Sequence, residues 1–443
     1  MEKTYWIQTL GCQMNERDSE TIAGLLEREG YARADDCRAA DVLVVNTCSV
    51  RENADNRFFG LLGRLKAVKD ARPGACVCVC GCMMQQEHIV ERIREKHAWV
   101  DFVFGTHNIH ELPDFLHGRT KGMVHVRRAR EAIVEGLPAR RAHGFKAYVN
   151  IMVGCNNYCS YCIVPYARGA EMSRRPEKVL EEVAGLAAAG TKEVMLLGQN
   201  VNSYDGGGVD FPALLRQVDA VPGIERIRFM TSHPKDLSDG LVALFVRGAD
   251  GRARGGGLER LCPAIHLPVQ AGSSRVLERM NRRYTKEGYL SLLAKLRGAN
   301  PGIVVTTDFI VGFPGETEED FEETLDVIER ARFDAAFTFL YSPRKGTPAA
   351  SFEDQVDEGV KHARFDRMVA RLNEISLEKN RALVGRTEEV LVEGPARTGA
   401  GMLAGRTFSG RLVNFAGDAS LAGRIVPVRL TAAGTFSFTG EAV

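Results

Sequence analysis

The residues best suited to metal chemistry are three cysteines in the segment GCNNYCSYC. Cys155, Cys159 and Cys162 follow a C-x3-C-x2-C spacing, directly after an apolar stretch that predicts a strand. Cysteine thiolates are the usual ligands of iron–sulfur clusters, and three of them can hold three irons of a [4Fe–4S] cluster. The fourth iron then keeps an open position, where a substrate or cofactor can bind. A structural zinc site is the alternative, but it needs a fourth ligand, and the nearest candidate, His143, precedes the strand.

A second set of three cysteines is spread over the N-terminal part of the chain. Cys12, Cys48 and Cys82 each end a predicted strand, in LGC, NTC and CGC, and are spaced by roughly one strand–helix–strand unit. In a parallel sheet the carboxyl ends of the strands lie at one edge, so the three thiols can meet there and hold a second cluster. Three buried, inert cysteines are the alternative, because free cysteine is commonly buried.

The sequence holds eleven cysteines and no recognisable export signal. In a reducing compartment this combination indicates metal binding or catalysis more than disulfide bonds. Cys76, Cys78 and Cys80 alternate within the strand that ends at Cys82, so a period of two places all four side chains on one face. Cys80 is the one most able to replace a cluster ligand. Cys37 and Cys262, which belong to none of these groups, are expected to be structural.

The first 120 residues predict a doubly wound α/β domain with a parallel sheet. Continuous apolar runs (YWIQTLGC, ADVLVVNTC and ACVCVCGC) alternate with helix-like segments such as 19–29 and 85–96. A basic linker at 121–143 follows. Its lysine and arginine side chains indicate either a solvated loop or a contact with nucleic acid.

Residues 144–375 form a second α/β series. Helical patterns include 176–188, 286–297 and 317–332, and the last begins with a Thr317-x-x-Asp320 capping box. Six strands with crossover helices predict a partial (β/α)6 barrel, whose functional face lies at the carboxyl ends of its strands. The six candidate strands are 147–153, 193–198, 226–231, 264–267, 304–311 and 335–341.

Residues 376–443 differ from both α/β parts. After a long polar helix at about 358–383, the segments EEVLVEG, AGMLAGRT, SGRLVNFAG, RIVPVRL and TFSFTG are short strands separated by glycine-containing turns. This pattern predicts a small OB-like β-barrel. Such barrels often bind nucleic acid, and a purely structural cap is the alternative.

Length, composition and charge exclude several classes of protein. The 443 residues suggest about three domains. A hydrophobic content of 44% and a charged content of 26% exclude fibrous and wholly disordered proteins. The formal charge of only +1 means that any nucleic-acid contact must rely on locally concentrated basic residues. With no run of 18 apolar residues and no signal-peptide pattern, we expect a cytoplasmic protein without a membrane span.

The C-x3-C-x2-C motif and the following IVPYARGAEMSRRP resemble the radical S-adenosylmethionine (SAM) enzymes of the methylthiotransferase group. The segments TLGCQMNERDSE, NTCSVRENAD, GCMMQ, TSHP, HLPVQAGS, MNRRYT and GFPGETEEDF look most like its tRNA-modifying branch. The resemblance covers essentially the whole chain and implies a methylthiotransferase domain, a radical SAM barrel and a TRAM domain, in that order. The sequence departs from the family pattern in two places. A glycine-rich insertion follows Arg247, and residue 271 is alanine where serine is commoner.

The resemblance implies a defined reaction. An isopentenylated adenosine beside the anticodon of a tRNA would exchange its C2–H bond for a bond to a methylthio group. The first set of cysteines would hold the [4Fe–4S] cluster that binds and cleaves SAM to the 5′-deoxyadenosyl radical, and the N-terminal set would hold an auxiliary [4Fe–4S] cluster that presents the sulfur. The implied partners are the tRNA anticodon stem-loop, an electron donor such as a flavodoxin or ferredoxin, and a sulfur source. We expect the enzyme to be a monomer that does not bind membranes.

The SAM molecule is expected to contact the cysteine loop and residues that end later barrel strands. Tyr161 is expected to lie over the adenine, and Arg174 to pair with the carboxylate of SAM. The alternative for each of these residues is a purely structural role in a loop. No general base is assigned. The full set is Tyr161, Arg174, Gly198, Gln199, Asn200, Ser232, Gln270 and Asp308.

Two other functions compete with this interpretation. A related methylthiotransferase could act on a ribosomal-protein side chain or on threonylcarbamoyladenosine in tRNA. A non-catalytic iron–sulfur electron carrier or RNA-binding module is a different class, but it does not account for open coordination at two three-cysteine sites.

Overall fold

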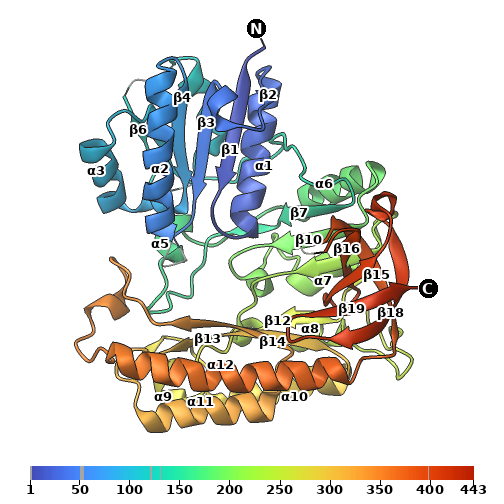
Figure 1. Ribbon diagram of the computed structural model, residues 1–443. Coiled ribbons are helices and arrows are strands. Elements are labelled where there is room, and N and C mark those ends of the chain that lie inside the picture. The colour runs from blue at the N-terminus through green and yellow to red at the C-terminus, as the bar shows by residue number, and fades with distance from the viewer. Residues whose placement is uncertain (1, 50–53, 120–121, 130, 398) are drawn as a thin grey trace.

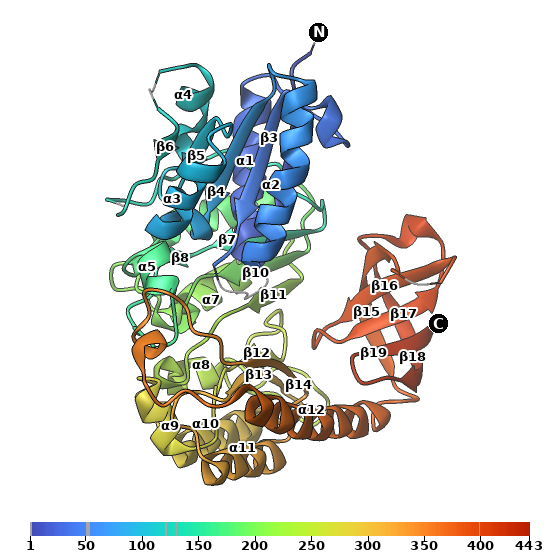
Figure 2. The ribbon, with the colours of Figure 1, turned by 60° about the vertical axis from the view of Figure 1, so that its left-hand side comes forward.

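The computed structural model describes residues 2–49, 54–119, 122–129, 131–397 and 399–443. The chain builds an N-terminal α/β part, a central α/β part and a C-terminal β-barrel, one after another (Figures 1 and 2). The C-terminal barrel lies beside the central part, and helix α1 of the N-terminal part packs against β7 of the central part. Within the described ranges no helix is long and apolar enough to cross a membrane.

The N-terminal part is a doubly wound parallel sheet, as predicted. Its six strands run in the order β2-β1-β3-β4-β5-β6. Helices α1 (Gln13–Arg28) and α4 (Leu112–Leu116) cover one face of the sheet, and α2 (Ala54–Ala71) and α3 (Glu87–Lys96) cover the other. The strands are β1 (Thr4–Thr9), β2 (Ala32–Arg33), β3 (Val42–Thr47), β4 (Cys76–Gly81), β5 (Phe102–Phe104) and β6 (Val124–His125).

The central part is a partial barrel of six parallel strands, also as predicted. Three strands pair in the order β11-β10-β7 and three in the order β12-β13-β14, and a parallel bridge between Ile227 and Leu261 connects the two groups. The strands are β7 (Lys146–Asn150), β10 (Glu193–Leu197), β11 (Arg226–Phe229), β12 (Ala264–His266), β13 (Val304–Val311) and β14 (Ala335–Leu340). The helices are α5 (Val164–Arg168), α6 (Pro176–Ala188), α7 (Phe211–Asp219), α8 (Asp239–Ala243), α9 (Ser274–Arg279), α10 (Lys286–Ala299), α11 (Glu318–Ala331) and α12 (Glu358–Arg381).

The first barrel strand is shorter than the predicted strand 147–153. Strand β7 ends at Asn150, and after Ile151 the chain forms β8 (Met152–Val153), which pairs antiparallel with β9 (Met172–Ser173). The segment with the three central cysteines lies between these two short strands. Their pairing therefore closes that segment into a loop at the carboxyl end of β7.

The C-terminal part is a closed five-stranded barrel in the order β15-β16-β17-β19-β18. Strands β17 and β19 pair in parallel, and the other neighbours are antiparallel. All five predicted strands are present, and their inward-facing apolar side chains form a core of their own. The strands are β15 (Thr387–Pro395), β16 (Met402–Thr407), β17 (Leu412–Ala416), β18 (Ile425–Ala433) and β19 (Ser437–Ala442).

Two buried arginines dock the C-terminal barrel onto the central part. Arg226 and Arg228, both on β11, donate three hydrogen bonds of 2.9 Å to backbone carbonyls of β15 and β16. Arg228 also pairs with Glu193 of β10, at 2.8 Å. These contacts lie near the amino ends of the barrel strands, whereas the segment that follows the cysteine loop contacts the N-terminal part.

Candidate functional site

The structure brings the three N-terminal cysteines together at one edge of the sheet. Cys12 is the N-cap of α1, Cys48 follows the last residue of β3, and Cys82 follows the last residue of β4. Strands β1, β3 and β4 are neighbours, so their carboxyl ends lie side by side. None of the three forms a disulfide bond. This is the juxtaposition that the spacing in the sequence predicts.

Tight loop packing holds these cysteines in place. Gly11 has a φ of +134°, and a Cβ there would lie 2.7 Å from the Cβ of Cys48. Only glycine tolerates both the backbone conformation and the close approach. Asn15, in the first turn of α1, donates to the carbonyl of Thr47 at 2.6 Å and to the side chain of Asn46 at 3.2 Å. The start of α1 is therefore fixed to the end of β3.

The central cysteines lie on one loop between β8 and α5. The amide of Cys155 donates to the carbonyl of Gly169 at 3.1 Å, and the amide of Cys162 donates to the carbonyl of Cys159 at 2.9 Å. Gly154 has a φ of +80°, and a Cβ there would collide with the carbonyl oxygen of Ala170. The loop thus folds back on the segment that follows α5.

Both sets of thiols suit iron–sulfur clusters. Burial raises the pKa of Cys82 to about 12, of Cys162 to about 12 and of Cys155 to about 11, so iron must displace their protons when it binds. No three His, Cys, Asp or Glu side chains among the described residues are arranged around a single ion. The thiolates of a [4Fe–4S] cluster bind separate irons and spread more widely. Neighbouring thiols, three of them buried and three half-buried, are the donor set that such a cluster requires.

Each set of cysteines also contacts one buried arginine, which the sequence interpretation did not single out. The Nε–H of Arg168 donates to Sγ of Cys82 at 3.0 Å, and its guanidinium pairs with Asp18 at 2.8 Å. Arg282 donates to Sγ of Cys159 at 3.4 Å. Burial lowers the pKa of Arg168, but Asp18 and the nearby thiols outweigh it and raise the pKa, so the side chain stays charged. The only sequence signal was that both arginines lie in motifs of the resemblance.

Three of the proposed SAM residues lie on the cysteine loop or beside it. Gln199 accepts a hydrogen bond of 2.6 Å from the amide of Gly154, the residue before Cys155. Tyr161, on the loop between Cys159 and Cys162, packs in the same apolar cluster as Tyr284. A Cβ at Gly198 would collide with the side chain of Met152. Gly198 and Gln199 thus pack against the start of the loop, and the contact of all three residues with SAM stays a prediction.

Other proposed SAM residues line the carboxyl ends of later strands. Asn200 donates to Asp236 at 2.7 Å, and neither its Oδ1 nor the buried Oγ of Ser232 has a hydrogen-bond partner among the described residues. Gln270 adopts a left-handed backbone with a φ of +75°. Asp308, by contrast, lies within β13 and not at its end as expected, 3.4 Å from His266. The two unpartnered oxygens are available to a bound ligand.

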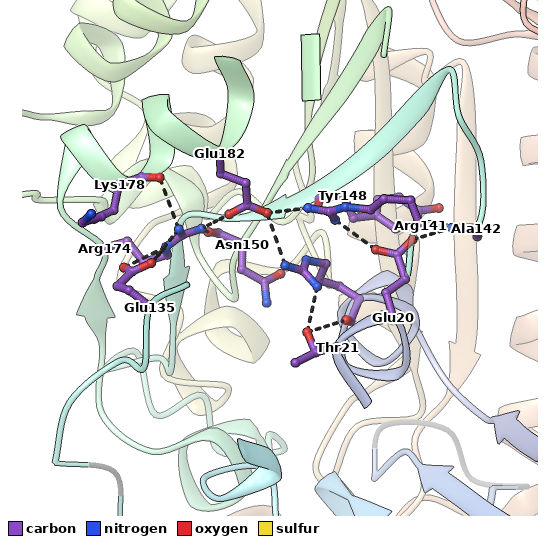
Figure 3. A network of polar contacts seen from close by, with 11 residues as sticks. Glu20, Thr21, Glu135, Arg141, Ala142, Tyr148, Asn150, Arg174, Lys178 and Glu182 are labelled. Atoms are coloured by element: carbon purple, nitrogen blue, oxygen red, sulfur yellow. Dashed lines mark hydrogen bonds and ion pairs between the residues drawn. The ribbon is translucent and has the colours of Figure 1, made fainter. Parts of the chain in front are cut away.

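Arg174 is committed to other partners. Its guanidinium binds Glu135, Glu182 at 2.6 Å and the backbone carbonyl of Asn150 at 2.7 Å (Figure 3). Its side chain is only 10% exposed. The expected pairing with the carboxylate of SAM would require breaking these contacts. The structure therefore does not bring Arg174 to the cysteine loop as a free cation.

Ion pairs engage the basic side chains of the linker. Every lysine and arginine between 119 and 146 that the structure describes has a carboxylate partner, and several of these pairs fasten the linker to the N-terminal part. Such pairing lowers the positive charge that these side chains offer to phosphates, and a nucleic-acid contact of the linker stays a prediction. The pairs are Arg119–Asp114, Arg127–Glu111, Arg128–Glu87, Arg140–Glu27, Arg141–Glu20 and Lys146–Glu393.

Three family models match consecutive parts of the chain. The model of the Uncharacterized protein family UPF0004 matches residues 4–105, that of the Radical SAM superfamily matches 149–328, and that of the TRAM domain matches 381–443. The N-terminal cysteines, the central cysteines and the C-terminal barrel thus fall in separate, known modules.

Two solved radical SAM structures share the fold. The methyltransferase TsrM of Kitasatospora setae, with cobalamin and a [4Fe–4S] cluster bound, has a TM-score of 0.56 at 16% identity, covering 91% of this chain and 81% of that one. The cobalamin-dependent enzyme OxsB, with SAM bound, has a TM-score of 0.54 at 12% identity, covering 84% of this chain and 58% of that one. At these identities the likeness concerns the fold alone.

Curated relatives match the chain over its full length, and each is named tRNA-2-methylthio-N(6)-dimethylallyladenosine synthase. The protein of Alkaliphilus oremlandii is 50% identical over 447 residues, which cover 100% of this chain and 93% of the relative. That of Clostridium botulinum is 48% identical over 445 residues, covering 99% and 97%. With its three modules in the same order, the chain belongs to the radical SAM methylthiotransferases, in the family of the tRNA-2-methylthio-N(6)-dimethylallyladenosine synthases.

Proposed function

We propose that the protein converts N6-isopentenyladenosine in tRNA to its 2-methylthio derivative. The observation that carries this proposal is the pair of three-thiol sites, one in each α/β part, in a chain about half identical to synthases of that name. An enzyme that must both cleave SAM and deliver sulfur needs two open metal positions, and two three-cysteine sites offer them.

The chain's own task is to hold and shield the cofactors. When bound, the two [4Fe–4S] clusters and SAM supply the radical and sulfur chemistry. We assign Cys12, Cys48 and Cys82 as ligands of the auxiliary cluster, and the three central cysteines as ligands of the cluster that binds SAM. The unpartnered side chains of Ser232 and Asn200 are the polar atoms that we expect to orient SAM.

A cavity beside the barrel strands suits a nucleobase. It has a volume of about 580 Å³ and lies between the inner face of the central strands and the C-terminal barrel. Phe337 of β14 and Phe436 line it and are 56% and 74% exposed. RNA bases that leave the stack bind to aromatic side chains in this way. We therefore place the anticodon-loop nucleotides at this cavity.

Unpaired basic charge on the C-terminal barrel supports an RNA contact. Four exposed arginines at or near this barrel form no ion pair with any residue that the structure describes, so their charge is available to phosphates. Neutralising a few phosphates in this way makes binding fall steeply with salt. They are Arg381, Arg386, Arg397 and Arg424.

Further parts of the proposal concern the surroundings of the enzyme. We propose a cytoplasmic monomer that receives electrons from a flavodoxin or ferredoxin and sulfur from a separate source. The absence of disulfide bonds among the eleven cysteines, all of which the structure describes, supports a reducing compartment.

Mass spectrometry of tRNA nucleosides tests the function. We expect cells that lack the protein to contain isopentenyladenosine without its 2-methylthio group, and the full chain to restore the product. For the acceptor, the reconstituted enzyme is offered anticodon stem-loops with isopentenyladenosine or threonylcarbamoyladenosine, and a ribosomal protein. Methylthiolation of either alternative acceptor in preference to isopentenyladenosine would contradict the proposal.

A further inference from the structure

We propose that Arg168 and Arg282 set the reduction potentials of the two iron–sulfur clusters, one arginine for each cluster. The inference rests on the proposed function, because it takes the two sets of cysteines to be cluster sites. It adds a task for two buried cations that contact a ligand sulfur and that no proposed step of the reaction uses.

Arg168 reaches the auxiliary site from the central part of the chain. It is the last residue of α5, which follows the central cysteine loop, yet its Nε–H donates to Sγ of Cys82 in the N-terminal part at 3.0 Å. Its side chain is 4% exposed. The pair with Asp18 of α1, at 2.8 Å, fixes the other side of the guanidinium. One nitrogen thus faces a sulfur and another faces a carboxylate.

The position of Arg168 is held from both parts. On one side, the hydroxyl of Thr106 in the N-terminal part donates to the carbonyl of Ala167 at 3.0 Å. On the other side, the carbonyl of Gly169 accepts from the amide of Cys155 at 3.1 Å. The residues before and after Arg168 therefore tie the auxiliary site to the loop of the other site.

Arg282 has the equivalent place at the central cysteines but a different charge balance. It donates to Sγ of Cys159 at 3.4 Å, to the carbonyl of Pro268 at 2.9 Å and, through Nε, to the hydroxyl of Tyr284 at 2.8 Å. Among the described residues no carboxylate forms an ion pair with it. Its positive charge is therefore not offset, whereas the charge of Arg168 is offset by Asp18.

The direction of the effect follows from electrostatics. A reduced cluster carries one more negative charge than the oxidised one, so a cation and an N–H donor at a ligand sulfur stabilise the reduced form and raise the potential. Burial strengthens such interactions, because water does not screen them. Because Asp18 offsets the charge of Arg168, we expect Arg282 to raise the potential of its cluster more than Arg168 raises that of the auxiliary cluster.

Redox titration followed by electron paramagnetic resonance tests the inference on the full chain, reconstituted anaerobically with iron and sulfide. Each cluster's signal is assigned in a background that lacks the other set of cysteines. Arg168→Gln should shift the auxiliary cluster to a more negative potential and leave the other cluster unchanged. Asp18→Asn should shift the auxiliary cluster in the positive direction. Arg282→Gln should make only the potential of the SAM-binding cluster more negative, by a larger shift than Arg168→Gln causes at the auxiliary cluster.

Two kinds of control separate tuning from a merely structural role. Arg174→Gln removes a comparably buried arginine that contacts no described thiol, and it should move neither potential. Arg168→Lys and Arg282→Lys keep the charge and should give smaller negative shifts than the glutamine variants. If a glutamine variant does not fold or bind its cluster, the lysine variants and Asp18→Asn carry the test.

The outcomes distinguish this inference from the proposed function. Unchanged potentials in Arg168→Gln, Asp18→Asn and Arg282→Gln, with both clusters present, would overturn the inference and leave the function intact. Fewer than two clusters in the unmodified protein would instead overturn the cluster sites on which both rest.

Discussion

Arg17 of α1 and Glu182 of α6 are separated by 165 positions in the chain, and their side chains form an ion pair of 3.2 Å. Glu182 also binds Arg141 of the linker and Arg174 after β9, both at 2.6 Å (Figure 3). A single carboxylate, 17% exposed, thus joins the N-terminal part, the linker and the barrel. The relative position of the two cysteine sites depends on this charged network as well as on apolar packing.

Removing the charge of Glu182 should loosen this junction. We expect Glu182→Gln to lower the free energy of unfolding by about 3 kcal/mol, because three largely buried arginines lose their shared counter-ion. Urea denaturation measures the change. Its neighbour Glu181 is 70% exposed and pairs only with Lys178, so Glu181→Gln is a matched control that should leave stability unchanged. Equal effects of the two substitutions would show that the network does not stabilise the junction.

The two cysteine sites should be separable by mutation. The unmodified protein should bind about eight irons, two clusters of four. Cys155→Ala should lose one cluster together with SAM cleavage, and Cys48→Ala should lose the other cluster and methylthiolation while SAM cleavage persists. Iron analysis and detection of 5′-deoxyadenosine measure these outcomes. Cys262→Ala removes a buried thiol outside both sets and should keep both clusters. Normal SAM cleavage by Cys155→Ala would refute the assignment.

The exposed ring of Phe337 should contribute to RNA binding. We expect Phe337→Ala to weaken binding of an isopentenylated anticodon stem-loop by about 1–3 kcal/mol, the usual value of one stacked base. Fluorescence anisotropy at fixed salt measures the affinity. Phe337→Tyr keeps the aromatic face and should bind like the unmodified protein. If alanine and tyrosine variants bind equally well, no base stacks on this residue.

Asp320 should make stability depend on acid pH. Burial alone would raise its pKa, but hydrogen bonds from Arg275, Ser273 and Thr317 lower it to about 2. The folded-state pKa lies below the unfolded value of 3.8, so the carboxylate stabilises the fold above about pH 4, by about 2 kcal/mol. This contribution is lost as the pH falls through about 2. The difference in urea midpoint between the unmodified protein and Asp320→Asn should therefore shrink between pH 6 and pH 2.5. A difference that does not change with pH would contradict the shift.

The sequence predicts the sheet architecture because local patterns encode it. The apolar run of β3 (Val42–Thr47) is entirely buried, as its composition suggests. The capping box of Thr317 and Asp320 begins α11 where the sequence places it. The first helix is the exception: it begins at Gln13, whereas the pattern suggested 19. Its first turns carry polar side chains such as Asn15 and Asp18, which usually indicate solvent exposure but here are buried at the junction.

In the candidate site, too, local patterns predict some contacts and not others. Spacing alone brings Cys12, Cys48 and Cys82 to one edge, because parallel strands end together. The contact of Arg168 with Cys82 spans 86 positions and two parts of the chain, so no local pattern encodes it. The partners of Arg174 likewise come from three separate segments, which is why the sequence suggested a free cation there.

The docking of the C-terminal barrel has a consequence for how this part of the enzyme can change. Arg226 and Arg228 hold it through backbone carbonyls, which every amino acid provides. Substitutions on the outer surface of the barrel therefore leave these three hydrogen bonds in place. The side chains that meet RNA can diverge, or be redesigned for another anticodon loop, while the module stays attached to the same catalytic core.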